Sequence, residues 1–275
     1  MLLSARYAPV CGARLLLLQS MRAYSTDALV LRTYRYGEAD QIVVFLTEDR
    51  GKKRGVAKNA TKSRRRFGAA LEPLTRGRAT YVEREARELV RLDRIEPKES
   101  PLSAVRARLG DEAVIALGHA AYFAELLDEW SPDGSPNERL FRLGAAVGEA
   151  LSEAGPPDVL ARYFEYWLLR LEGVYPALDR CPRCGEARLA AGAVFIAGEH
   201  AYVCRECSDG KLRLSPDAMR FLRTAGRRTP RDVMASDVPG LALREMGAVH
   251  DRLIAFHLEK ELRSARVVKE LGRPL

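Results

Sequence analysis

Residues 41–47 have the sequence QIVVFLT, and this short apolar run decides the fold of the first third of the chain. So short a run, rich in Val, Ile and Phe, is typical of a buried strand. The segments 28–32, 79–82 and 89–95 have the same character, and polar or glycine-bearing stretches separate them. Four or five strands in about 70 residues predict a small closed barrel, and no helix–strand alternation indicates a Rossmann-like domain.

Helical periodicity replaces the strand pattern after Pro97. Ser100-Pro101 is typical of a helix start, and apolar residues then recur every three or four positions as far as Trp130. We expect further helices over 136–154, 158–172, 215–225 and 240–263. The predicted fold class is α+β and multidomain, with a barrel over 21–97 and a helical domain over 98–275. Residues 1–20 are expected to be an extension before the folded protein, which would begin at Met21.

Four of the five cysteines form two CxxC pairs, separated by 19 residues. Two such pairs can close a tetrahedral four-sulfur site, whereas a redox CxxC would need a βαβ unit nearby. A disulfide framework is typical of short secreted chains and is not expected in this one. We therefore expect a structural Zn²⁺ in a module over 178–212, inserted in the helical domain. The expected ligands are Cys181, Cys184, Cys204 and Cys207.

Positive charge is concentrated in the first third of the chain. The net charge is +8, and residues 1–96 hold 20 Lys/Arg against 11 Asp/Glu. The densest tract, Arg50–Arg66, has nine cations and no acid after Arg50. Such a single-sign run favours a polyanion ligand over a solvated loop, and nucleic-acid phosphate is the expected one. One or two of the nearby aromatics, Tyr24, Tyr34, Tyr36, Phe45, Phe67 and Tyr81, are expected to stack on bases.

No catalytic pattern accompanies these signals. The sequence has no GxSxG, HExxH or P-loop motif, and the predicted helices contain His119, His250 and His257 as isolated residues. Histidines in such positions are more typical of packing than of catalysis, so we do not expect an enzyme. The chain also has no run of 18 apolar residues, so neither a membrane-spanning helix nor a membrane partner is expected.

Several short motifs resemble the RecO family of bacterial DNA repair proteins. They are Gly37-Glu38-Ala39-Asp40, Arg54-Gly55-Val56-Ala57-Lys58, Arg66-Phe67-Gly68, Leu71-Glu72-Pro73-Leu74, Leu178-Asp179-Arg180-Cys181 and Leu262-Arg263-Ser264-Ala265-Arg266. The resemblance spans residues 21–272. It departs at Asn59-Ala60-Thr61, where the family often has Gly-Ala-Arg.

The resemblance implies an N-terminal OB-fold, a helical bundle and a zinc module. It further implies a recombination mediator that binds single- and double-stranded DNA, anneals complementary strands and helps load RecA onto DNA coated by single-strand-binding protein, together with RecR. Such a protein would act in the cytoplasm at the nucleoid. In the family, an acidic tail of single-strand-binding protein docks on the helical domain. Candidates for that contact are Arg162, Arg170 and Arg252.

Two other functions remain open from the residues alone. An RNA-binding protein with a zinc ribbon would have the same basic barrel, and a zinc-dependent nucleic-acid enzyme would have the same cysteines. Preference for RNA or metal-dependent turnover would distinguish them from DNA annealing without a nucleotide cofactor. The expected DNA contacts are Arg35, Arg50, Lys52, Lys53, Arg54, Lys58, Lys62, Arg64, Arg65 and Arg66.

Overall fold

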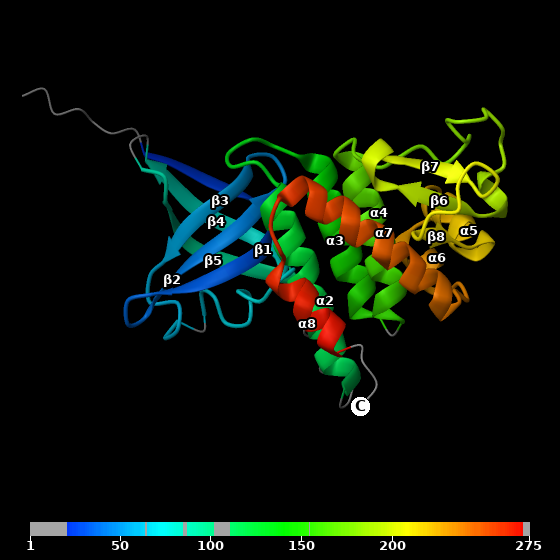
Figure 1. Ribbon diagram of the computed structural model, residues 1–275. Coiled ribbons are helices and arrows are strands. Elements are labelled where there is room, and N and C mark those ends of the chain that lie inside the picture. Colours follow the sequence, from blue (N-terminus) through cyan, green and yellow to red (C-terminus); the bar gives the residue numbers. More distant parts are fainter. Residues whose placement is uncertain (1–20, 64, 85–86, 102–110, 154, 272–275) are drawn as a thin grey trace, which may run out of the picture.

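The computed structural model describes residues 21–63, 65–84, 87–101, 111–153 and 155–271. Figure 1 shows a β-barrel at one end of the molecule, a helical body in the middle and a small second sheet at the other end. The expectation that residues 1–20 are an extension lies outside the described residues. None of the described helices is long and apolar enough to cross a membrane.

Five strands form the barrel. They are β1 (Met21–Tyr36), β2 (Asp40–Thr47), β3 (Gly51–Ala57), β4 (Arg76–Arg84) and β5 (Val90–Glu99). Their order around the barrel is β1-β2-β3-β5-β4. Strands β3 and β5 run parallel, and the other neighbours pair antiparallel. A closed barrel of five strands with this order is OB-like, which confirms the predicted fold.

Both faces of β2 are buried, and this explains its uninterrupted apolar sequence. Val43 and Phe45 face a core inside the barrel, together with Tyr81 of β4. Val44 and Leu46 belong to a different apolar cluster, which continues into the helical body. Because successive strand residues point to opposite faces, one short run supplies both cores. The barrel is therefore attached to the helices by an apolar surface.

Strand β3 was not predicted, because its sequence is GKKRGVA. Its glycines allow it to pass close to neighbouring backbone. Gly51 has φ +69°, and a Cβ there would lie 2.2 Å from the backbone oxygen of Ser135. A Cβ on Gly55 would lie 3.0 Å from the Cβ of Leu92 on β5. The tract that begins at Arg50 is thus partly a strand, which its charge did not indicate.

The helical body begins with a three-helix core. Helix α2 (Asp111–Trp130) contacts β1, and α3 (Glu138–Ser152) and α4 (Pro157–Leu171) pack against it. Asn137 caps α3 by accepting a hydrogen bond from the backbone N–H of Leu140 at 3.1 Å. The chain then passes through the cysteine module. It returns as α5 (Pro216–Ala225), α6 (Pro230–Met234), α7 (Gly240–Leu258) and α8 (Arg263–Leu271).

The helices match the expected ones except for the short α6, which was not predicted, and the C-terminal end. The segment expected to be one helix over 240–263 ends at Leu258, because Glu259 adopts the left-handed conformation with φ 52°. Helix α8 follows and packs across α2. Part of the long helix predicted from Ser100 to Trp130 lies in 102–110, outside the described residues.

The cysteine module lies between α4 and α5, where it was expected. It contains the short 3-10 turns η1 (Leu189–Ala191) and η2 (Ala197–Glu199). Its sheet consists of β6 (Ala193–Ile196), β7 (Ala201–Cys204) and β8 (Arg213–Leu214), in the order β7-β6-β8.

A buried chain of hydrogen bonds joins the module to the helices. Tyr202 of β7 donates to the Tyr175 hydroxyl at 3.1 Å, and that hydroxyl lies 2.9 Å from Nε2 of His250. Nδ1 of His250 lies 2.8 Å from Glu165 of α4. Burial lowers the pKa of His250, so its ring is neutral at pH 7 and its Nδ1–H can donate to the carboxylate. His250 is therefore packed and hydrogen-bonded on both sides within the interior of the protein.

Candidate nucleic-acid interface and metal centre

The folded structure divides the cations of the basic tract into three groups: those paired with distant acids, one that is buried, and those that remain at the surface. Strand alternation sends neighbouring cations of β3 to opposite faces, and carboxylates from distant parts of the sequence lie beside several of them. Lys53 contacts Glu83 of β4 at 2.6 Å. Arg54 lies 3.6 Å from Asp133, in the loop after α2. A linear count of charge could not detect these acids, because they are 30 and 79 residues away in sequence.

Lys52 is buried between the barrel and the helical body. Its Nζ donates to the carbonyl oxygen of Asp128 at 2.5 Å and lies 3.2 Å from that residue's carboxylate. Its backbone also bonds to the loop after α2, where Gly134 donates to the Lys52 carbonyl at 3.0 Å. Only 7% of Lys52 is exposed. It joins two parts of the fold, and we remove it from the proposed DNA contacts.

Other cations of the tract remain at the surface. Lys58, Lys62 and Arg65 are exposed just after β3, and Arg35 is exposed at the end of β1. Arg50 lies over the ring of Tyr24, 3.9 Å from its centroid. These residues are available to a ligand, whereas the contact expected of Arg64 lies outside the described residues.

Arg66 has a partly structural environment. Its Nε donates to the Ser63 hydroxyl at 3.0 Å, and its guanidinium also donates to the Lys58 carbonyl at 2.5 Å. These bonds hold the turn after β3 in place and leave Lys58 exposed beside it. Arg66 is therefore expected to orient the other cations more than to bind a ligand alone.

A cationic groove lies on one side of the barrel, and all five strands contribute residues to it. It consists of two adjoining pockets of about 690 and 330 Å³ that share Arg84, Arg87, Glu88 and Val90. Its charged lining comprises six cations and three carboxylates. They are Arg22, Lys53, Lys58, Arg84, Arg87 and Arg91, with Asp40, Glu83 and Glu88. The groove therefore combines concave shape with excess positive charge.

Two tyrosines add base-sized apolar surface to this groove. Tyr36 and Tyr24 line its two pockets, and Tyr36 is 49% exposed. Phe45, Phe67 and Tyr81 are buried in the barrel core, so they cannot stack on a ligand. Of the six aromatics considered from the sequence, Tyr36 is the best placed to meet a base. Tyr34 is also exposed, on the same strand.

Sequence reasoning missed four cations of the groove: Arg22, Arg84, Arg87 and Arg91. In the sequence, each of the last three has an acid within two positions, which hides it from a search for single-sign runs. Arg22 lies 28 positions before the start of the tract and joins the groove because β1 pairs with β4. The strand pattern predicted a closed barrel, and closure brings β1 beside β4. This was the signal in the sequence that could have indicated these cations.

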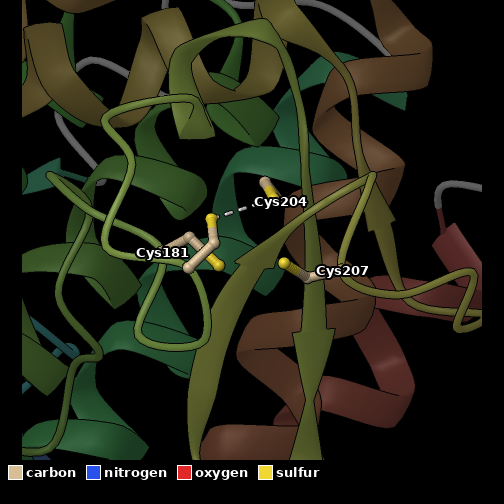
Figure 2. A group of neighbouring side chains, drawn as sticks. Cys181, Cys204 and Cys207 are labelled. Carbon is tan, nitrogen blue, oxygen red and sulfur yellow. Dashed lines mark hydrogen bonds between the residues drawn. The ribbon is translucent and has the colours of Figure 1, made fainter.

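The four module cysteines converge on one point. Their sulfur atoms all lie within 4.8 Å of one another, and Sγ of Cys184 is 3.7 Å from Sγ of Cys204. Figure 2 shows the labelled sulfurs of Cys181, Cys204 and Cys207 directed toward a common centre. Four thiolates at about 2.3 Å from a tetrahedral Zn²⁺ would be about 3.8 Å apart, so the geometry fits this ion. His200 lies outside the cluster, with Nε2 2.7 Å from the carbonyl of Val174.

The backbone around Cys181 favours its thiolate. Burial acts to raise the pKa of this thiol, but backbone N–H groups of Cys204, Cys184 and Arg183 bond to the sulfur and lower the pKa to about 6. Hydrogen bonding from the other cysteines raises the pKa of Cys207 to about 12. Such a set suits a divalent cation, which would neutralise thiolates that otherwise repel one another.

The three arginines considered for partner binding differ in their surroundings. Arg162 is partly buried and bonds at 3.0 Å to Glu165, which is fully buried, so we remove Arg162 from the proposed contacts. Arg170 bonds to the Tyr166 hydroxyl and lies near the Trp167 ring. Arg252 is exposed on α7.

The other two histidines of the helical body lie in different surroundings. His119 is buried, with Nε2 3.2 Å from the Asp158 carboxylate, and His257 is exposed.

An OB-like barrel with a cationic groove, joined to a helical body that holds a four-cysteine module, defines a class of proteins built to handle nucleic acids. Comparison with known families identifies the member. The model for the N-terminal part of recombination protein O matches residues 21–101, and the model for its C-terminal part matches residues 112–266. The chain belongs to the RecO family of DNA repair and recombination proteins.

Individual relatives agree over most of the chain. It is 39% identical over 249 residues to the DNA repair protein RecO of Anaeromyxobacter sp. (strain K), which covers 89% of this chain and 95% of that protein. It is 35% identical over 253 residues to the DNA repair protein RecO of Geobacter metallireducens, which covers 91% and 99%. The match to the Koribacter versatilis protein of the same name is 46% over 163 residues, or 58% of this chain and 63% of the relative.

Proposed function

We propose that this protein is a recombination mediator that binds single- and double-stranded DNA through the groove of its barrel. The observation that carries the proposal is the groove itself, with six cations and Tyr36 along its length. Cations there would neutralise phosphates without reading sequence, and the tyrosine face would stack on any base. The cations Arg35, Arg50, Arg54, Lys62, Arg65 and Arg66 of the sequence-based proposal supplement the groove, which itself includes Lys58. Arg64 stays in the proposal from its sequence alone.

The reaction in this proposal is strand annealing without catalytic turnover. Neutralising phosphates on one strand lowers its repulsion for the complementary strand, so no bond needs to be made or broken. The protein would also help load RecA onto DNA coated by single-strand-binding protein, with RecR as a further partner. Arg252 and Arg170 remain the proposed contacts for the acidic tail of single-strand-binding protein. The proposed place of action is the nucleoid in the cytoplasm.

Zn²⁺ is the proposed occupant of the four-cysteine site, with a structural role. The ion would join the two CxxC turns and supply no reaction, because four thiolates fill a tetrahedral coordination sphere. Cys181 and Cys184 come from the start of the module and Cys204 and Cys207 from its end, so the ion would close the module. The hydrogen-bond chain through Tyr202 and Tyr175 would then hold the module against the helices.

An annealing assay with complementary oligonucleotides, bare and coated with single-strand-binding protein, tests the function. The groove variant Lys58→Ala/Arg87→Ala/Arg91→Ala should bind single-stranded DNA more weakly, with a salt slope lower by about two units. Annealing should slow with it. Arg139→Ala/Arg142→Ala/Arg244→Ala, which removes three exposed cations of the helical body, is the matched control. Equal affinity and slope in the groove variant and the parent would exclude the groove as the binding site.

A further inference from the structure

A second concentration of positive charge lies in the near-neutral part of the chain. A pocket of about 480 Å³ is formed between α5 and η1 of the cysteine module. Its lining contains Arg220, Arg223, Arg227, Arg228, Thr224, Ala190 and Pro216. No carboxylate belongs to this lining, and the four arginines are exposed.

The helix and its exit loop explain why these arginines gather. Positions 220, 223 and 227 are three and four residues apart, which places them on one side of α5 and of the turn that follows it. Side chains of α4 hold that turn by its carbonyl oxygens. Trp167 donates from Nε1 to Ala225 at 3.0 Å, and Tyr163 donates from its hydroxyl to Arg228 at 3.1 Å. The guanidinium groups therefore extend from fixed backbone.

The charge of this pocket is only partly balanced by the protein's own carboxylates, and one of these, Asp232, is close enough for the charge of Arg228 to act on it. Arg220 pairs with Asp217 at 2.6 Å. Among the described residues, no carboxylate lies within ion-pair distance of Arg223, Arg227 or Arg228. The C-terminal end of a helix carries only about half a negative charge, so stabilising α5 does not require three further cations. A polyanion is the ligand that such an excess favours.

The chemistry of the lining favours nucleic-acid phosphate over an acidic peptide. Guanidinium forks bind phosphate oxygens in pairs, and Thr224 adds a hydroxyl donor. The apolar lining consists only of Ala190 and Pro216, which offers no cavity for a hydrophobic side chain of a peptide. Phosphates require no such cavity.

We infer that this α5 pocket binds the phosphate backbone of a second nucleic-acid strand. Figure 1 shows α5 at the end of the molecule opposite the barrel, so a strand held there would not compete with one held in the barrel groove. One chain would thus carry two strands at once. The binding site stands on its own observations, whereas its use in annealing rests on the proposed function of the barrel.

The test compares two triple variants of the full chain that lose the same charge. Arg223→Ala/Arg227→Ala/Arg228→Ala empties the α5 pocket of its unpaired cations, and Arg139→Ala/Arg142→Ala/Arg244→Ala is the control. Each triple variant is introduced both into the parent sequence and into the groove variant Lys58→Ala/Arg87→Ala/Arg91→Ala. The affinity for oligo-dT is then measured at several salt concentrations. In the groove-variant background, loss of the pocket cations should lower affinity at least tenfold and reduce the salt slope by about two units.

A bridging assay gives the second readout. The protein is bound to an immobilised oligo-dT, and capture of a second, fluorescent oligo-dT is measured at equal protein loading. The parent and the control should capture the second strand, and the pocket variant should lose most of this capture while it still binds the first. Parent-like capture and slope in the pocket variant would overturn the inference, as would binding of a poly-glutamate peptide in preference to oligo-dT. Failure of the barrel proposal would appear separately, as a groove variant with unchanged affinity.

Discussion

Lys52 lies among cations in the sequence, yet its ammonium group is enclosed by acceptors from the helical body. The Asp128 carbonyl and carboxylate and the Asp133 carboxylate surround its Nζ. Lys52→Ala would leave the buried Asp128 with Arg32, 3.5 Å away, as its remaining cation and would remove the donor to the Asp128 carbonyl, so the expected loss is about 2 kcal/mol. Urea unfolding should show a loss of that size, while the DNA affinity of the folded variant should stay within twofold of the parent.

Lys58→Ala is the matched control, because Lys58 is exposed and lines the groove. This variant should unfold at the same urea concentration as the parent but bind DNA more weakly, with a salt slope lower by about one unit. If Lys52→Ala instead keeps full stability and loses DNA affinity, Lys52 is a DNA contact and its structural role is refuted.

Asp27 gives the barrel an acid-sensitive contact. Burial acts to raise the pKa of this carboxyl, but a hydrogen bond from Lys98 and the charges of Lys98, Arg76 and Arg78 lower the pKa below its usual value. Its oxygens lie 2.7 and 2.8 Å from Nζ of Lys98, which joins β1 to β5. A carboxyl with a lowered pKa stabilises the fold above its unfolded pKa of about 3.9 and loses that contribution as pH falls through the folded value.

Asp27→Asn should therefore cost about 1 kcal/mol of unfolding free energy at pH 7, because the partners are partly exposed. The difference from the parent should stay constant between pH 5 and 7 and shrink below pH 4. Urea unfolding at a series of pH values measures both. A difference that persists unchanged to pH 3 would show that the carboxylate charge is not the cause.

The cysteine module is the element whose folding we expect to depend most on a ligand, because its four sulfurs meet at one point. Cys184→Ser should abolish bound zinc, which elemental analysis of the parent should show at about one ion per chain. Hydrogen exchange should increase over residues 180–214 while the barrel strands keep their protection. Cys11→Ser removes the one cysteine that belongs to neither CxxC pair and should retain the metal. Reduced, unchelated parent protein without zinc would contradict the assignment.

Elements with apolar patterns could be predicted from the sequence, and elements built from charge could not. Strand β2 was predictable because both of its faces are buried. Strand β3 was not, because glycines at 51 and 55 fit it against its neighbours while its cations face outward or pair with distant acids. The same limit hid the groove cations, which come together only when β1 closes on β4.

The helix α7 shows a smaller error of the same kind. In the sequence, Leu241, Met246, Val249, Leu253 and Phe256 recur at helical spacing, which predicts one buried stripe. Leu241 and Phe256 are nevertheless 56% and 69% exposed. Ala242, Met246 and Val249 are the residues that face the core. The four residues of the cysteine cluster, in contrast, could all be predicted from the sequence. Each CxxC spacing places two sulfurs close together, so the fold only has to bring the two pairs to one point.

The whole molecule is organised around an apolar contact between the barrel and the helices. Leu29, Leu31, Val44, Leu46 and Leu74 of the barrel side share one cluster with Phe123 and Leu127 of α2. Burying each such side chain contributes roughly 1.5–3 kcal/mol, so the five together match the net stability of a typical domain, about 5–15 kcal/mol. The barrel therefore has its own internal core and shares a second apolar cluster with the helices, while the expected boundary at residue 97 lies within β5.

A barrel expressed alone, as residues 21–101, should consequently be unstable. Its internal core is intact, but the surface around Leu29 and Leu46 would be exposed to water and would favour self-association. Thermal unfolding of this fragment should occur well below that of the full chain, with aggregation. In the fragment, Leu29→Ser/Leu46→Ser should reduce aggregation, because these substitutions remove exposed apolar surface. They should not raise the unfolding temperature, because they bury no additional side chain. A soluble fragment that unfolds at the temperature of the full chain would show that the barrel core suffices and that the contact with α2 only orients the two parts.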